Sequence, residues 1–398
     1  MMPMLYIKRT VAMSFFLFFI NRPSNAQNVA FLDTVISIPK AAINESSPHW
    51  LVSAKQWGDT LRYVYQSKKY IHFITLCPNG SKYFHQENKI KLKRIGNKDI
   101  YVRSFDYRGN KLYLLTFLKI IEVDLSNGEI LKTINCNRVE NIFLYKKYIF
   151  GIAYYNRHRS SCPYKVALFK YHLQNSNCID SLYLDLPFLE YTHFAPNELI
   201  DFNGEEFVFA RFDCLGFTRV STDLKNIKTD SFAMPNWVRP SKKLSDKILE
   251  KANTSPLLWK LLDEENNGRI SRLDYINYLN DSSMILRWLA LPKDWKYSTR
   301  KLGIAKRREG RWYMDSTFWE IPLKIQMEAP VSKVGFPLMS GNYATTYTEN
   351  RIYQFKIHLP YEFNEKTSYR DYLRDTQKLQ AEEAGLQLWV FKPTAWSF

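Results

Sequence analysis

The chain has 398 residues, of which 45% are hydrophobic and 16% are aromatic, and its formal net charge is +17. After the N-terminal region no stretch approaches the ~18 consecutive apolar residues of a membrane-spanning helix, which excludes a helical membrane protein. The length exceeds that of a typical single core, but a ring of repeats can hold it in one domain, and the charge indicates either a generally basic surface or an anionic partner.

Residues 1–26 are predicted to be a secretory signal peptide. Lys8 and Arg9 form a short basic region, an apolar run follows at 11–20, and Ser24 and Ala26 supply the small residues of a cleavage site. A signal anchor is the alternative, but the apolar run is only about half as long as a bilayer-crossing helix requires. We therefore expect an exported protein, located in the periplasm, at the cell surface or outside the cell, with no transmembrane segment once the signal is removed.

Residues 27–398 are predicted to form one β-propeller domain. Four successive stretches each contain four short strand-like segments separated by turn residues. In the clearest of them Asn127-Gly128 is typical of a tight hairpin turn. The four stretches cover 51–92, 101–134, 139–186 and 198–234.

Repeating four-stranded units of this length predict an all-β fold, a six-bladed propeller, with five or seven blades as lesser alternatives. A pair of β-sandwich domains is the structural alternative. The last strand-like segment, at 386–392, or the early segment at 29–38 could complete a shared blade.

A helical insertion is predicted at 238–283 within the propeller. Apolar residues recur there at helical spacing, including Leu244 and Ile248, and a further helix is predicted over 273–279. Strand-like pattern returns from Met284 onward, which would supply the fifth and sixth blades.

The repeat at 109–134 reads GNKLYLLTFLKIIEVDLSNGEILKTI. With the signal peptide, this pattern resembles the secreted six-bladed β-propellers of the TolB-like and NHL-like type from Gram-negative bacteria. The resemblance spans roughly 50–358 and marks architecture, not chemistry. It implies a protein that binds a partner.

Residues 263–274 resemble the calcium loop of EF-hand and dockerin modules. Gly268 stands where such a loop turns sharply, and oxygen donors recur at the spacing that surrounds one calcium ion. The predicted Ca²⁺ ligands at loop positions 1, 3, 5, 7, 9 and 12 are Asp263, Glu265, Asn267, Arg269 (through its carbonyl), Ser271 and Asp274. Glu265 and Asp274 depart from the usual EF-hand residues, and a polar turn between two helices is the alternative reading.

Catalytic motifs of the common enzyme classes are absent from the sequence, and its seven histidines are scattered. We therefore predict a non-catalytic binding or interaction module, whose protein or glycan ligand sits over the central channel or across the loops at the blade tops. The alternative is a polysaccharide hydrolase or lyase with a site built from blade loops. Nucleic acid is not expected as a partner of an exported protein. Cys162 and Cys178 flank a predicted strand pair and could form a disulfide.

Overall fold

The structure is a computed structural model. It describes residues 30–38, 51–66, 70–79, 82–91, 102–136, 138–155, 165–184, 199–211, 214–234, 237, 271–289, 300–321, 345–358 and 385–393.

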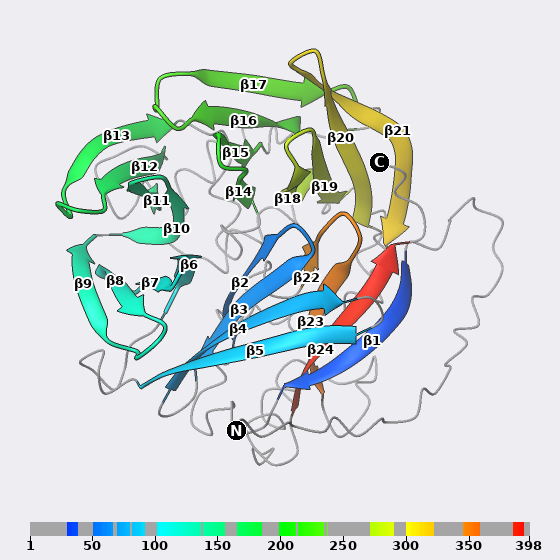
Figure 1. Ribbon diagram of the computed structural model, residues 1–398. Coiled ribbons are helices and arrows are strands. Elements are labelled where there is room, and N and C mark those ends of the chain that lie inside the picture. The colour runs from blue at the N-terminus through cyan, green and yellow to red at the C-terminus, as the bar shows by residue number, and fades with distance from the viewer. Residues whose placement is uncertain are drawn as a thin grey trace, which may run out of the picture.

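The described strands form six antiparallel four-stranded sheets, arranged around a central axis (Figure 1). The first sheet holds β2 (Leu51–Trp57), β3 (Thr60–Gln66), β4 (Tyr70–Asn79) and β5 (Lys82–Lys91). The second holds β6 (Ser104–Arg108), β7 (Lys111–Leu115), β8 (Lys119–Asp124) and β9 (Ile130–Asn135). The third holds β10 (Val139–Tyr145), β11 (Tyr148–Tyr155), β12 (Lys165–His172) and β13 (Cys178–Leu184).

The remaining three sheets repeat this order. The fourth holds β14 (Ile200–Phe202), β15 (Glu206–Ala210), β16 (Leu215–Ser221) and β17 (Ile227–Phe232). The fifth holds β18 (Arg272–Asn280), β19 (Ser283–Leu289), β20 (Arg300–Arg308) and β21 (Arg311–Ile321). The sixth holds β22 (Thr345–Tyr347), β23 (Ile352–His358), β24 (Gly385–Pro393) and β1 (Ala30–Ile38).

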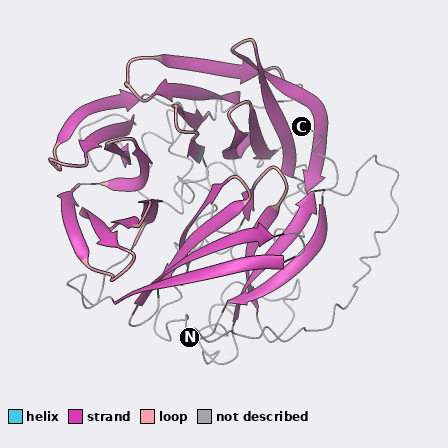
Figure 2. Ribbon diagram, in the orientation of Figure 1, coloured by secondary structure: helices cyan, strands magenta, loops and turns pink. Residues whose placement is uncertain are grey.

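The all-β propeller prediction is confirmed, and Figure 2 shows that the described elements are almost all strands. The first and last described strands close the ring, because β1 pairs antiparallel with β24, with Val35 opposite Trp389. The predicted shared blade therefore forms from both ends of the chain.

The sheets pack face to face, so the inner strands bury both of their faces, whereas outer strands such as β9, β13 and β17 are largely exposed. Between the third and fourth sheets, the Phe150 and Phe207 rings lie 4.9 Å apart and both side chains are fully buried. Burying one such ring contributes about 1.5–3 kcal/mol. A single four-stranded sheet has no partner for its second face, and the radial arrangement supplies one.

The helix predicted over 273–279 is wrong, because these residues belong to β18. Two bulges interrupt the pairing of β18 with β19, one after Leu273 and one after Tyr278. Each bulge shifts the two-residue alternation of a strand by one position. The first bulge therefore places Leu273 and Ile276, three apart, on the same buried face, which imitates helical spacing. The predicted insertion thus loses its last part, 272–283, to the propeller, and its residues 238–270 lie outside the described ones.

The cysteines also differ from the prediction. Cys178 is a free, exposed thiol, so it does not form the disulfide considered with Cys162, which lies outside the described residues. Cys77 and Cys136 are free thiols as well.

Candidate functional site: a polar cavity in the central channel

A cavity of about 460 Å³ lies where the six sheets converge. The innermost strand of every sheet contributes to its wall, namely β2, β6, β10, β14, β18 and β22. The turns that follow these strands contribute Gly58, Gly204 and Asp281. The cavity therefore lies toward the face of the ring that carries the inner hairpin turns, and its volume is in the range of small-molecule sites.

Equivalent positions of the inner strands line this cavity. In each sheet a hairpin turn joins the inner strand to the next strand, and a residue pair closes this turn. The equivalent position is the inner-strand residue two positions before that pair. In the second sheet that pair is Arg108–Lys111, and the residue is Asp106. In the first, third, fourth and sixth sheets the same position holds Lys55, Phe143, Asp201 and Thr346. In the fifth sheet it falls on Tyr278, beside the second bulge of β18.

Lys55 crosses from the first sheet to the next two. Its Nζ lies 3.5 Å from Asp106 Oδ2, donates to the carbonyl oxygen of Ile142 and lies 4.1 Å from the centre of the Phe143 ring. Burial lowers the pKa of Lys55, while the carboxylates of Asp106 and Asp201 oppose that shift. The ammonium group is thus already engaged within the protein.

Asp106 is fully engaged as well. Its Oδ1 accepts a hydrogen bond from the backbone N–H of Tyr107, and its Oδ2 accepts one from that of Leu144, both at 2.8 Å. Leu144 belongs to the neighbouring sheet, so this carboxylate joins two blades. With Lys55 as counter-ion, the charge of Asp106 is compensated.

Asp201 has the same backbone donors but a different electrostatic environment. Its Oδ2 accepts a hydrogen bond from the N–H of Tyr278 in the next sheet, at 2.6 Å, and the N–H of Phe202 also donates to it. Among the described residues no cation lies within ion-pair distance of this carboxylate. Desolvation raises the pKa of Asp201 to about 7, against the opposing effects of these N–H groups and of the more distant Lys55.

In two side-chain amides at the cavity, one of the two polar atoms has no hydrogen-bond partner among the described residues. Gln56 Nε2 donates to the carbonyl oxygen of Tyr278 at 2.9 Å, and Gln56 Oε1 is buried without a partner. Asn203 Oδ1 accepts from the N–H groups of Glu205 and Glu206, and Asn203 Nδ2 is buried without a partner in the described structure. Both residues line the cavity, and each of these two polar groups is costly to leave unpaired.

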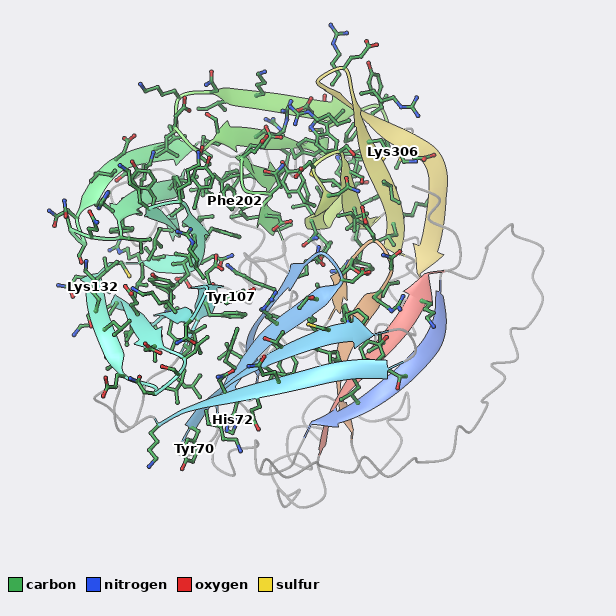
Figure 3. All side chains as sticks on the ribbon, viewed as in Figure 1. Tyr70, His72, Tyr107, Lys132, Phe202 and Lys306 are labelled. Carbon is green, nitrogen blue, oxygen red and sulfur yellow. The ribbon has the colours of Figure 1, made fainter. Side chains whose placement is uncertain are left out.

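Aromatic rings flank these groups. Tyr107 and Phe202 each follow the aspartate of their strand and line the cavity. Figure 3 shows both on the inner side of the ring, whereas Lys132 and Lys306 lie toward its outside. Sequence reasoning missed this site, although one signal was available. The pattern apolar–Asp–aromatic–x–Gly occurs at 105–109 and again at 200–204.

The predicted calcium ligands lie elsewhere. Asp263, Glu265, Asn267 and Arg269 are outside the described residues, so the structure does not show whether they converge. Ser271 is buried directly before β18, and Asp274 lies within β18. The segment after the loop is a strand, which differs from the helix that follows an EF-hand loop.

A catalytic arrangement of the predicted alternative kind would bring histidines or carboxylates to one point. The described residues that line the cavity include Asp106, Asp201 and Asp281 but no histidine or cysteine. In the described part of the chain, no group of three metal-ligating side chains comes together. None of its helices could cross a membrane.

Comparison with known proteins identifies the fold. No protein family matches the sequence, and no curated protein matches it. A candidate exported protein of Bacteroides fragilis is 13% identical over 93% of this chain and 97% of its own, with a TM-score of 0.51. A member of the DUF4221 family from Bacteroides vulgatus is 10% identical over 92% of this chain and 98% of its own, with a TM-score of 0.48. At such identities the likeness concerns the fold alone.

Proposed function

We propose that this protein is an exported, non-catalytic binding module whose ligand, a glycan or a segment of a protein, enters the central cavity. The observation that carries the proposal is the pair of buried, unpaired amide groups, Gln56 Oε1 and Asn203 Nδ2. Buried polar groups in folded proteins almost always have partners, so an unpaired donor and acceptor beside one cavity favour a polar ligand that satisfies both.

Export is supported by the signal-peptide pattern at 1–26. The Bacteroides fragilis protein of similar fold is described as a candidate exported protein, which agrees with this expectation. The ring also suits a binding role, since it brings side chains from six sheets to one cavity.

A second candidate, a glycan hydrolase, is favoured by one observation. Asp201 has a pKa of about 7, and a second carboxylate, Asp106, lies on the same cavity. Glycoside hydrolases combine a carboxyl group of raised pKa with an ionised one. Here, however, both carboxyl groups accept backbone hydrogen bonds from the neighbouring sheet, and Asp106 is paired with Lys55, so their geometry serves to join blades.

The test is a variant that fills the cavity. Asn277 lines it, and Asn277→Trp would place a large ring there. Asn135→Trp is the matched control, because Asn135 is exposed on the outer strand β9. Binding of a panel of soluble saccharides and peptides is measured by calorimetry for the three proteins, and turnover of the saccharides is followed by reducing-end analysis.

We expect a ligand that binds the wild type and the Asn135→Trp variant equally and fails to bind the Asn277→Trp variant, with no turnover. Equal binding by all three folded proteins would place the binding surface outside the cavity and contradict the proposal. Turnover that is lost in Asn277→Trp would establish the hydrolase instead.

A further inference from the structure

We propose that the cavity selects an amino sugar, whose ammonium group pairs with Asp201 and Gln56 while a ring hydroxyl accepts a hydrogen bond from Asn203. This inference rests on the proposed function and names its ligand class.

The internal repetition of the ring supplies the first argument. Asp106 and Asp201 occupy equivalent positions of the second and fourth sheets, and each accepts an N–H from the inner strand of the following sheet. Asp106 has a cation at 3.5 Å, because the equivalent position of the preceding sheet is Lys55. For Asp201 the preceding sheet places Phe143 at that position, which brings no charge. Among the described residues, the fold thus places the same carboxylate in two sheets and an ion-paired cation beside one of them, Asp106.

The neighbouring acceptor is the second argument. Gln56 Nε2 and Asp201 Oδ2 both bond the backbone of Tyr278, one at its carbonyl oxygen and one at its N–H. Their side chains therefore meet at the same stretch of β18. Gln56 Oε1 is unpaired there. An ammonium group has three donors and no acceptor, so it can satisfy a carboxylate and an amide oxygen together.

The third argument separates an amino sugar from a simple amine. Asn203 Nδ2 needs an acceptor, which an alkylammonium does not have. A sugar ring adds hydroxyl oxygens, and its apolar face can stack on an aromatic ring such as Tyr107 or Phe202, both of which line the cavity. The cavity volume of about 460 Å³ is sufficient for a monosaccharide or disaccharide.

The charged and titratable groups around Asp201 define the expected pH dependence. They are Lys55 on β2, Asp106 on β6, and Tyr275 and Tyr278 on β18. Both tyrosines have pKa values raised by burial and stay neutral. Because the carboxyl group of Asp201 must ionise to pair with the ligand, binding should weaken from pH 7 to pH 5.

The experiment measures dissociation constants at pH 7 by titration under NMR observation. The probes are glucosamine, its uncharged counterpart glucose, and putrescine, which has ammonium groups but no oxygen. The proteins are the wild type, Asp201→Asn and the control Asp180→Asn, which removes the same charge from the exposed outer strand β13. Thermal melts confirm that all three are folded.

We expect the wild type and Asp180→Asn to bind glucosamine at least about tenfold more tightly than glucose or putrescine. Asp201→Asn should weaken glucosamine binding by about 10- to 100-fold, since a hydrogen bond to a charged group is lost, and leave glucose unaffected. Equal affinities for glucosamine and glucose, unchanged binding in Asp201→Asn, or putrescine binding as tightly as glucosamine would each overturn the inference.

These failures differ from a failure of the proposed function. If a neutral saccharide or a peptide binds the wild type and not Asn277→Trp, the cavity is a binding site and only the amino-sugar assignment is wrong. If Asn277→Trp alters no binding at all, the cavity is not the site, and the proposed function fails with it.

Discussion

Replacing Asp201 by asparagine removes an ionisable group from the cavity and keeps the size of the side chain. In the folded protein the pKa of Asp201 is about 7, raised from an ordinary value of 3.8 by desolvation. Between these two pH values the folded state retains a proton that the unfolded state releases. The free energy of unfolding of the wild type therefore falls, through this group, as the pH rises from about 4 to about 7, and is level above that.

The magnitude follows from the two pKa values. One pKa unit corresponds to about 1.36 kcal/mol, so the rise from 3.8 to about 7 gives an upper value on the order of 4 kcal/mol. The pKa of about 7 already contains the attraction of Lys55, and solvent screening at the cavity reduces the effect further. We expect the stability of Asp201→Asn relative to the wild type to increase by about 1–3 kcal/mol between pH 5 and pH 8.

The assay is urea unfolding of both proteins at pH 5 and pH 8. Other carboxyl groups titrate in both proteins and cancel in the comparison. A constant difference is also expected, because an asparagine has one acceptor oxygen for two N–H donors, and it cancels between the two pH values. Asp106→Asn makes the same substitution at the equivalent position but leaves Lys55 without its carboxylate, so it should destabilise the protein at both pH values.

The reasoning would be refuted if the stability difference between Asp201→Asn and the wild type were the same at pH 5 and pH 8. Asp201 would then carry its charge in the cavity without an energetic cost, and it would need no cationic ligand.

Three further predictions concern other parts of the molecule. A hydrogen bond from His72 Nδ1, at 2.6 Å, holds the pKa of Glu87 at about 2, so its stabilisation is present above pH 4.5 and is lost as the pH falls toward 2. Glu87→Gln should therefore lower the free energy of unfolding by about 1 kcal/mol at pH 7 and by less at pH 3, and an equal loss in urea unfolding at both would contradict this. A Cβ at Gly216 would lie 2.3 Å from a backbone oxygen of the adjacent strand, whereas at Gly151 it would lie 3.1 Å from two side chains. Gly216→Ala should thus lower the free energy of unfolding by about 2 kcal/mol or more, and Gly151→Ala should lower it by less. A lower melting temperature for Gly151→Ala than for Gly216→Ala would contradict this prediction. Millimolar calcium should raise the melting temperature of the wild type and not of Asp263→Ala, and no shift in the wild type would favour a polar turn.

The local hairpins could be predicted because their signals are local. Asn127-Gly128 marks a turn, and Gly128 has a φ of 70°, in the region that glycine adopts without strain. The turn joins β8 and β9, two of the four strands predicted for this stretch. The four-strand period then predicts blades, because a sheet of this size must bury its second face on another one.

The inner strand β18 could not be predicted because its pattern depends on its neighbours. Tyr275 and Leu279 pack toward the sixth sheet, whereas Leu273 and Ile276 pack toward the fourth. A strand buried on both faces has no alternation of apolar and polar residues, and two bulges then give it a spacing near that of a helix. Periodicity alone cannot separate these cases.

The cavity could not be predicted for a different reason. Its equivalent residues in successive sheets are 37 to 77 positions apart in the chain, and none belongs to a known catalytic motif. They become equivalent only when the closing pairs of the inner hairpins are aligned, which requires the sheet register. A sequence search for sites looks first for histidines and cysteines, whereas the described charged residues that line this cavity are lysine, arginine and aspartate.

The ion pair between Lys55 and Asp106, which joins equivalent positions of neighbouring sheets, predicts that substitutions of the two residues are not additive. Lys55→Met retains the aliphatic stem against Phe143 and leaves Asp106 without a cation, whereas Asp106→Asn leaves Lys55 without an anion. Each single variant should lose about 3 kcal/mol of unfolding free energy, because removing one partner leaves an uncompensated buried charge. The double variant removes both charges, so its loss should be smaller than the sum of the single losses by about 1–3 kcal/mol in urea unfolding at pH 7. Strict additivity would mean that Lys55 does not neutralise Asp106, and the contrast with Asp201, on which the cavity's preference for a cation rests, would then disappear.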